Sequence, residues 1–363
     1  MKCTILSVLC CIPFAAPAQL GIVPVGILPG GGVSSAHSVS HDGSYVVGVT
    51  TFGLASSVPF IWSRSTGLYE IDVPDIGFNF TAGNVSFDGE YVSGSFVLNG
   101  GQGPAGYVWS RKTGVVQLPS LPGGNLSTGV GFVGRGAEFA IGSSTFAVNP
   151  FGAQLRRAVR WSFANGLESL PLPTSQDETG NSFASNILDD GRIFISASSG
   201  SWLWSEESGF EHLPGADGLR FISSDGKLLS GTRTNFDILA DGATYWTEET
   251  GVRFLPLTDP GAVSSVNGMS DDGSIIVGRQ STESVVWVEM GLPVTLQDYA
   301  ASLGIDITGW TALNALDISD DGSTIVGFGR YQEINQGFVL TIPAPASSLT
   351  LPLALIALRH RRR

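Results

Sequence analysis

Three residue types that could form a nucleophilic triad lie close together near the start of the sequence. Ser38, His41 and Asp42 supply a hydroxyl, an imidazole and a carboxylate, the groups that a serine hydrolase uses as nucleophile, base and orienting acid. Here they are neighbours on one expected hairpin, whereas a working triad converges from separate parts of a scaffold. We therefore expect an ordinary turn at these residues and no catalysis.

Paired carboxylates offer a second route to chemistry. Glu206-Glu207 and Glu248-Glu249 could act as the acid and base of a glycosidase, which needs two carboxyl groups roughly 5–10 Å apart. The corresponding turns elsewhere in the chain hold Arg64 and Arg111-Lys112. A position that accepts either charge is typical of a solvated rim, so these pairs do not indicate a hydrolase.

Doubled aspartates precede glycine at Asp189-Asp190, Asp271-Asp272 and Asp320-Asp321, and they could bind calcium. One calcium ion needs about six to eight oxygen ligands, and the sequence has no Asp-x-Asp-x-Asp loop, so we expect turn chemistry and no metal site. P-loop, HExxH and GxSxG motifs do not occur either. We predict no cofactor and no catalytic residue.

The densest basic group outside the two ends is Arg156, Arg157 and Arg160, beside an insertion over residues 143–157. This group could hold an acidic glycan or pair with neighbouring acids, and the second arrangement is the more common one. His212 follows Glu211, and we expect it to be a strand residue with no special role.

The composition narrows the class of fold. The chain has 363 residues, with 48 Gly, 19 Pro and only 14% charged residues. The Gly excess without a Gly-X-Y period excludes collagen, and a 42% hydrophobic share with eight Trp and 20 Phe excludes a disordered chain. Acidic residues outnumber basic ones by 32 to 19, which argues against nucleic acid as a partner. A packed, turn-rich fold remains.

Both ends of the sequence look like sorting signals. Residues 1–18 combine Lys2, an apolar stretch and a small-residue triplet ending at Ala18, which predicts a secretory signal peptide. Residues 343–363 join a Pro-Ala-Pro segment, a short apolar run and an Arg cluster, and this order resembles the PEP-CTERM class of bacterial sorting signals. The resemblance implies transient membrane anchoring of the tail and processing by an exosortase-type enzyme. The residues that carry the tail signal are Pro343, Pro345, Arg359, Arg361, Arg362 and Arg363.

Between these ends one unit recurs seven times. Each copy has an apolar segment, Asp-Gly, an apolar pair ending in Gly, a loop, a segment ending in Trp, a Gly turn and a short strand ending in Leu-Pro. The Asp-Gly positions begin at residues 42, 88, 136, 190, 225, 272 and 321, although the third holds Gly136-Ala137, and Leu340 takes the Trp position of the seventh unit. The repeated residues are Asp42, Gly43, Trp62, Asp88, Gly89, Trp109, Trp161, Asp190, Gly191, Trp204, Asp225, Gly226, Trp246, Asp272, Gly273, Trp287, Asp321 and Gly322.

The physics of the unit predicts the architecture. Asp-Gly between apolar segments predicts a type I′ hairpin, and the flanking Val, Ile, Phe and Tyr favour strands. Four short strands per unit predict an all-β propeller of seven four-stranded blades over residues 19–342, with each Trp between adjacent blades. A β-solenoid is the competing architecture, but its repeats are usually shorter.

Two details refine this prediction. The seventh unit lacks a fourth strand, and Val25–Pro29 matches the Leu-Pro endings of other units, so we expect the N-terminal strand to complete the last blade and remove exposed sheet edges. One helix is expected from Leu296 to Leu303, capped by Thr295 and ended by Gly304. We expect it to pack as a lid on the ring.

The units resemble the HAF family of extracellular repeats over residues 21–343. The most specific part is the C-terminal block that contains Leu296–Tyr299, Gly309-Trp310 and Ile318–Gly322. The segment Ser224–Lys227 is also similar to TolB-type propeller repeats. The HAF resemblance implies secretion and a propeller-like fold, and it implies no established activity.

These observations predict a secreted, non-enzymatic protein of the bacterial cell envelope or extracellular matrix. We expect it to bind carbohydrate or another matrix polymer, because propeller rims offer concave loop surfaces. Two alternatives stay open: a cryptic polysaccharide lyase or glycosidase at the propeller mouth, and a purely structural matrix component.

Overall fold

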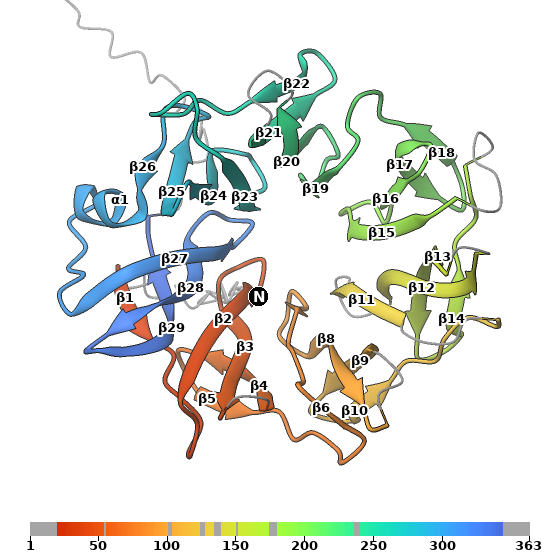
Figure 1. Ribbon diagram of the computed structural model, residues 1–363, viewed down its shortest axis with the longest axis horizontal. Helices are drawn as coiled ribbons and strands as arrows, with labels where there is room; N and C mark the ends of the chain where they lie inside the picture. Colours follow the sequence, from red (N-terminus) through yellow and green to blue (C-terminus); the bar gives the residue numbers. More distant parts are fainter. Residues whose placement is uncertain are drawn as a thin grey trace, which may run out of the picture.

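The computed structural model describes residues 20–343 except 54–55, 101–103, 124–127, 134–138, 150–151, 174–179 and 236–239. The described chain forms seven antiparallel sheets that stand as blades around a common axis (Figure 1). The all-β propeller with seven blades, predicted from the repeats, is therefore confirmed.

Each blade runs from an inner strand at the axis to an outer strand at the rim. Blade 1 contains β2 (Val33–Val39), β3 (Tyr45–Phe52), β4 (Ser56–Ser63) and β5 (Gly67–Glu70). Blade 2 contains β6 (Gly77–Phe78), β7 (Asn84–Val85), β8 (Tyr91–Leu98), β9 (Pro104–Ser110) and β10 (Gly114–Gln117). Blade 3 contains β11 (Thr128–Val133), β12 (Ala140–Val148), β13 (Gln154–Ser162) and β14 (Gly166–Ser169).

The remaining blades follow the same order. Blade 4 contains β15 (Ser182–Ile187), β16 (Ile193–Ala197), β17 (Gly200–Ser205) and β18 (Gly209–His212). Blade 5 contains β19 (Leu219–Ile222), β20 (Leu228–Asn235), β21 (Ala240–Thr247) and β22 (Gly251–Phe254). Blade 6 contains β23 (Ser264–Met269), β24 (Ile275–Gln280), β25 (Glu283–Val288) and β26 (Val294–Thr295), and blade 7 contains β27 (Trp310–Ile318), β28 (Thr324–Tyr331), β29 (Ile334–Thr341) and β1 (Gly21–Pro24). Blade 2 has five strands because its inner strand is broken into β6 and β7, which both pair with β8.

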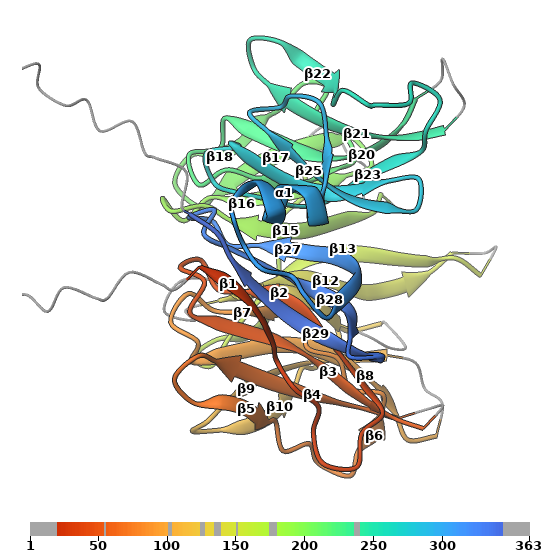
Figure 2. The same ribbon diagram turned by 90° about the vertical axis from the view of Figure 1, so that its left-hand side faces the viewer.

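The N-terminal strand closes the ring, as predicted. β1 pairs antiparallel with β29, with Gly21 opposite Thr341, and the two strands lie side by side (Figure 2). The alignment differs by three residues from the predicted one. The Val25 N–H donates to the Gly337 carbonyl (2.9 Å), as the Leu118 N–H does to that of Gly106. The N-terminal strand is thus aligned by a glycine and the aliphatic residue four positions after it. The Leu28-Pro29 pair, on which the predicted alignment was based, lies beyond the strand.

The Asp-Gly turns differ from the predicted type I′ turns. That type needs a positive φ at both central residues, yet only the glycine has one, with φ of 72° at Gly43. Ser40, two residues earlier, donates through Oγ to Asp42 Oδ1 (2.9 Å) and accepts from the Tyr45 N–H (2.9 Å). This buried hydroxyl closes a longer loop. The same bonds recur at Ser86, Ser223, Ser270 and Ser319.

A β-bulge interrupts the inner strand of six blades at equivalent positions. Beside it, a backbone carbonyl lies against the glycine that ends the apolar pair of the second strand. A Cβ built on Gly48, Gly278 or Gly327 would lie 2.0, 1.9 or 1.9 Å from that carbonyl oxygen. Only glycine fits without a backbone shift, which explains why this position of the repeat is glycine.

The hydrophobic core is divided into seven clusters, each spanning the contact between two adjacent blades. Trp246 of blade 5 packs against Leu203 and Leu213 of blade 4. The indole N–H groups of Trp246 and Trp287 donate to the carbonyls of Pro214 and Pro256, each at 2.9 Å. The Trp and Leu-Pro positions of the repeat therefore meet across the blade contact.

The predicted helix is present as α1 (Leu296–Ser302), with the Thr295 side chain accepting from the Asp298 N–H. It lies at the outer edge of blades 6 and 7 (Figure 1) rather than over the ring as a lid. The reason is that Leu296 takes the place of the buried leucine after the fourth strand and carries Ala300 into the same cluster. No helix among the described residues is long and apolar enough to cross a membrane.

The close contact at the repeat glycine predicts that adding one methyl group there lowers the stability strongly. Gly278→Ala would place a Cβ 1.9 Å from the Ser265 carbonyl oxygen, so we expect the free energy of unfolding to fall by about 2 kcal/mol or more in urea denaturation. Gly261→Ala is the matched control, because its Cβ meets nothing closer than 3.8 Å. Equal stability of the two variants would contradict the assignment.

Substitution of either of two buried serines is expected to raise the stability of the protein. The hydroxyls of Ser93 and Ser230 have no hydrogen-bond partner within the described part of the chain, and they stand where other blades have Val47 and Val277. Ser230→Val removes an uncompensated polar group and adds apolar burial, so we expect thermal unfolding to show a stability gain of about 1 kcal/mol. Ser40→Val, which breaks the turn, should lower stability; a loss in both variants would refute this account.

Candidate functional site at the mouth of the central cavity

A cavity of about 890 Å³ lies at the centre of the ring and is lined by residues of all seven blades. Its wall consists of inner-strand residues, of the loops that carry the Asp-Gly turns, and of residues at the ends of β13 and β17, among them Arg160 and Glu206. We call the end formed by those loops the mouth. The residue before each turn aspartate lines this end, and we call these side chains the mouth residues: His41, Phe87, Asp189, Ser224, Asp271 and Asp320.

The inner-strand bulges shape the wall of the cavity. A bulge re-aims a side chain by adding one residue to a strand, and the added residues His37 and Asn267 line the cavity. His37 donates through Nδ1 to the Ala82 carbonyl (3.3 Å), and Asn267 donates to the Ala315 carbonyl (2.8 Å). Burial lowers the pKa of His37, so this imidazole is neutral at neutral pH and ties blade 1 to blade 2.

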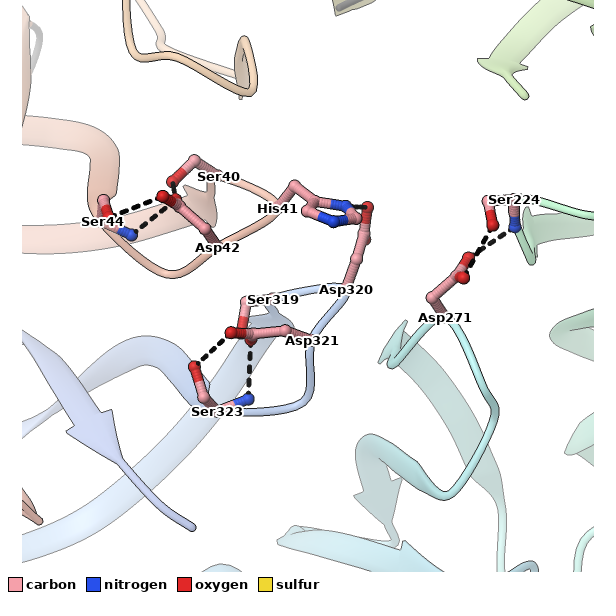
Figure 3. A network of polar contacts seen from close by, with 10 residues as sticks. All are labelled: Ser40, His41, Asp42, Ser44, Ser224, Asp271, Ser319, Asp320, Asp321 and Ser323. Atoms are coloured by element: carbon pink, nitrogen blue, oxygen red, sulfur yellow. Dashed lines mark hydrogen bonds and ion pairs between the residues drawn. The ribbon is translucent and has the colours of Figure 1, made fainter. Parts of the chain in front are cut away.

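Four of the mouth residues bind one another across blades: His41, Ser224, Asp271 and Asp320 (Figure 3). His41 Nδ1 lies 2.6 Å from Asp320 Oδ2, between blades 1 and 7. The Asp271 N–H donates to the Asp320 carbonyl (2.8 Å). Ser224 donates through N–H and Oγ to the two carboxylate oxygens of Asp271, at 2.5 and 2.7 Å. One polar network therefore links blades 5, 6, 7 and 1 at the mouth.

Asp317 lies behind this network at the contact of blades 7 and 1. Its Oδ2 accepts from Ser38 Oγ (2.9 Å) and the Val39 N–H (3.1 Å), and its Oδ1 accepts from the Ile318 N–H (2.9 Å). Burial of the carboxyl group raises the pKa of Asp317 to about 7, although these hydrogen bonds oppose the rise. The cavity thus holds one carboxyl group that titrates near neutral pH.

The structure does not bring Ser38, His41 and Asp42 together as a triad. Ser38 faces Asp317 and His41 faces Asp320. Asp42 accepts from Ser40 and Ser44 within its own turn (Figure 3). Each polar group therefore serves a different contact, in agreement with the expectation of a turn.

The glutamate pairs and the arginine group also occupy separate contacts. Arg160 donates to Glu168 (2.7 Å) and Glu206 (2.5 Å), which joins blade 3 to blade 4. The guanidinium of Arg157 lies over Phe146, 4.6 Å from the ring centroid. Glu248 and Glu249 line a second cavity between blades 5 and 6. The ring of His212 lies 4.4 Å from that of Trp202 at the rim of blade 4.

The turn aspartates use their oxygens in their own loops. Asp42 and Asp272 each accept from the backbone N–H two residues later and from two serine hydroxyls. Partial burial alone would raise the pKa of these carboxyls, but the hydrogen bonds outweigh it and lower the pKa of both. No group of three or more His, Cys, Asp or Glu side chains suited to a metal occurs among the described residues.

Sequence reasoning missed the mouth residues as a set. Their signal was present, since each precedes the aspartate of a turn that recurs through the chain. The buried serines of the turns were missed because they lie two residues before Asp-Gly, outside the dipeptide that predicts a hairpin. The third turn, the segment 1–18, Pro345 and the Arg cluster lie outside the described residues.

Comparison with known proteins supports the fold and no more. No family model and no curated protein matches the chain. The β-propeller domain of the Trilobed protease from Pyrococcus furiosus is 8% identical, with a TM-score of 0.53 over 85% of this chain and 95% of that one. That propeller is described as having an open velcro topology, whereas β1 pairs with β29 in this chain.

Two peptidases give similar matches. A prolyl endopeptidase is 12% identical, with a TM-score of 0.56 over 87% of this chain and 51% of its own. Prolyl oligopeptidase B from Galerina marginata is 12% identical, with a TM-score of 0.54 over 83% and 47%. The chain spans about half the length of these two proteins. The fold and the comparisons therefore define the chain as a β-propeller protein.

The environment of Asp317 predicts a specific pH dependence. Its pKa is 3.8 in the unfolded reference and about 7 in the folded protein, so the folded state holds a proton that the unfolded state releases, and this contribution is lost as the pH rises toward 7. Relative to Asp317→Asn, we expect the wild type to lose unfolding free energy between pH 4 and 7, by at most about 1.4 kcal/mol per pH unit. Urea denaturation over this range measures it. Asp72→Asn, at an exposed position, is the control, and a pH-independent difference for Asp317→Asn would refute the assignment.

Proposed function

We propose that this propeller is a secreted, non-enzymatic binding protein of the cell envelope or extracellular matrix, and that it holds a polysaccharide at the mouth of its central cavity. The observation that carries the proposal is the cavity itself, which places aromatic, amide and carboxylate side chains around one concave space of about 890 Å³. Concave sites with a few convergent polar groups are the usual form of ligand sites.

Phe87 and His41 give the mouth an aromatic side. The Phe87 side chain is 38% exposed, and its ring lies 4.8 Å from that of His41. Asn84, Asn165 and Asn186 line the same cavity. A sugar ring has an apolar face of C–H groups and a rim of hydroxyls, so aromatic surface beside amides and carboxylates suits both parts of it.

Secretion and sorting complete the proposal. The segment 1–18 would direct export, and the tail 343–363, with its resemblance to PEP-CTERM signals, would anchor the chain transiently for an exosortase-type enzyme. β1 begins beside the end of β29, so the two chain ends leave the same blade.

A second candidate, a cryptic polysaccharide lyase or glycosidase, is favoured by one observation. Asp317 lines the cavity with a pKa of about 7, which is the range that a general acid of a glycosidase needs. Both of its oxygens already accept hydrogen bonds within the contact of blades 7 and 1. Depolymerisation of an exopolysaccharide by the purified ring would favour this candidate over simple binding.

The binding proposal predicts the effect of removing one aromatic ring. We expect Phe87→Ala to weaken the glycan binding of residues 19–342 by about tenfold on a glycan array and in calorimetry, because stacking on one aromatic side chain is worth roughly 1–3 kcal/mol.

Phe254→Ala is the control, since Phe254 is 43% exposed on the outer strand β22, away from the cavity. Equal affinities of the two variants would place the glycan elsewhere. Absence of glycan binding and of depolymerisation, with defective cell aggregation on deletion of the protein, would favour the purely structural alternative.

A further inference from the structure

We infer that the site selects polysaccharides with protonated amino groups and rejects acidic ones, and that the polymer extends from the mouth outward between blades 5 and 6. The inference rests on the proposed function and adds the chemical class and path of the ligand. Three observations carry it: the charge of the cavity wall, the ion pairs formed by the one arginine among the described lining residues, and a second cavity that continues from the first.

The charged residues that line the central cavity are predominantly acidic. Asp189, Glu206, Asp271 and Asp320 line it, and Arg160 is the one Lys or Arg among its described lining residues. Asp317 also lines the cavity, but burial raises its pKa to about 7, so it adds little negative charge below neutral pH. Charges of one sign in a concave site focus their potential and raise the local concentration of ligands of opposite sign. A carboxylate- or sulfate-bearing polymer would therefore be repelled.

The positive charge of Arg160 is matched by two carboxylates, Glu168 and the lining residue Glu206, so these three groups together stay net negative. Its Nε donates to Glu168 and its Nη2 to Glu206, at 2.7 and 2.5 Å, and the guanidinium lies 5.2 Å from the ring centroid of Phe139. An arginine engaged by two carboxylates has little capacity left for an anionic sugar.

Asp271 receives its hydrogen bonds from neutral donors. Within the described part of the chain, its carboxylate oxygens accept from the N–H and hydroxyl of Ser224, which fix its orientation. Asp320 faces His41, whose imidazole is positive only when protonated. A protonated amine can therefore gain a charge-assisted hydrogen bond at Asp271.

The second cavity extends the acidic surface away from the axis. It measures about 770 Å³ and shares Ser223, Ser224 and Asp271 with the central cavity. Glu248, Glu249 and Asp272 line it, and its one basic residue, Lys227, pairs with Asp225 at 3.1 Å. The glutamate pair that the sequence analysis singled out thus belongs to a continuous acidic path, which suits an extended polymer better than a single sugar.

The experiment compares three polymers of matched length on residues 19–342: a glucosamine oligomer, its N-acetylated form and a polyuronate. At about pH 6, where amines are protonated, we expect the amino polymer to bind about tenfold more tightly than the acetylated one. Raising the salt from about 50 to about 300 mM should reduce that advantage, and the polyuronate should not bind.

A double variant and a matched control test whether the acidic path causes the preference for the amino polymer. Asp271→Asn combined with Glu249→Gln should remove the advantage of the amino polymer over the acetylated one. Asp72→Asn is the matched control and should change neither. Thermal unfolding of each variant verifies that the ring remains folded.

The outcomes separate this inference from the proposed function. Equal binding of the amino and acetylated polymers, or tighter binding of the polyuronate, would overturn the inference and leave glycan binding intact. Failure of the folded protein to bind any of the three or any glycan on the array would overturn both.

Discussion

The architecture depends on closing the ring through the pairing of β1 with β29. A single blade leaves both faces of its sheet uncovered, and each of the seven apolar clusters needs residues of two blades. Without the last contact, the faces of blades 7 and 1 would be exposed to water. The cluster of Val25, Trp62 and Val339 forms only when the N-terminal segment has joined the last blade.

Closure also assembles the cavity, because the seam between blades 7 and 1 contributes much of its polar wall. Ser38 and Val39 reach Asp317 only across that seam, and His41 reaches Asp320 in the same way. The pKa of Asp317 is therefore a property of the closed ring. The same contacts that complete the fold determine the electrostatics of the candidate site.

Much of the fold could be predicted from the sequence because the repeat encodes it locally. Leu213 follows Trp204 by nine positions and Leu255 follows Trp246 by nine, and such a recurring spacing predicts a blade even where the loops between the strands differ in length. The turn type was wrong because a dipeptide rule ignored Ser40, whose hydroxyl decides the loop length. The predicted alignment of the N-terminal strand was wrong because Leu28-Pro29 resembles the Leu-Pro endings of the repeats. The backbone pairing instead begins at Gly21 and places Val25 in the position of the leucine.

The site was harder to predict because its mouth residues come from six separate turns. Asp271 and Ser224 are 47 positions apart, and their contact follows from the angle between blades, which no local pattern specifies.

In five of the described turns the serine, aspartate and glycine serve the loop itself, as the bonds of Ser40 and Asp42 show, and blade 4 has Leu188 in place of the serine. The residue between serine and aspartate has no part in those bonds. It is histidine in blade 1, phenylalanine in blade 2, serine in blade 5 and aspartate in blades 4, 6 and 7. The repeat thus separates two kinds of contact by position: the serine, aspartate and glycine bond within one turn, whereas the residue between them varies and makes its contacts between blades, as His41 does with Asp320 and Ser224 with Asp271.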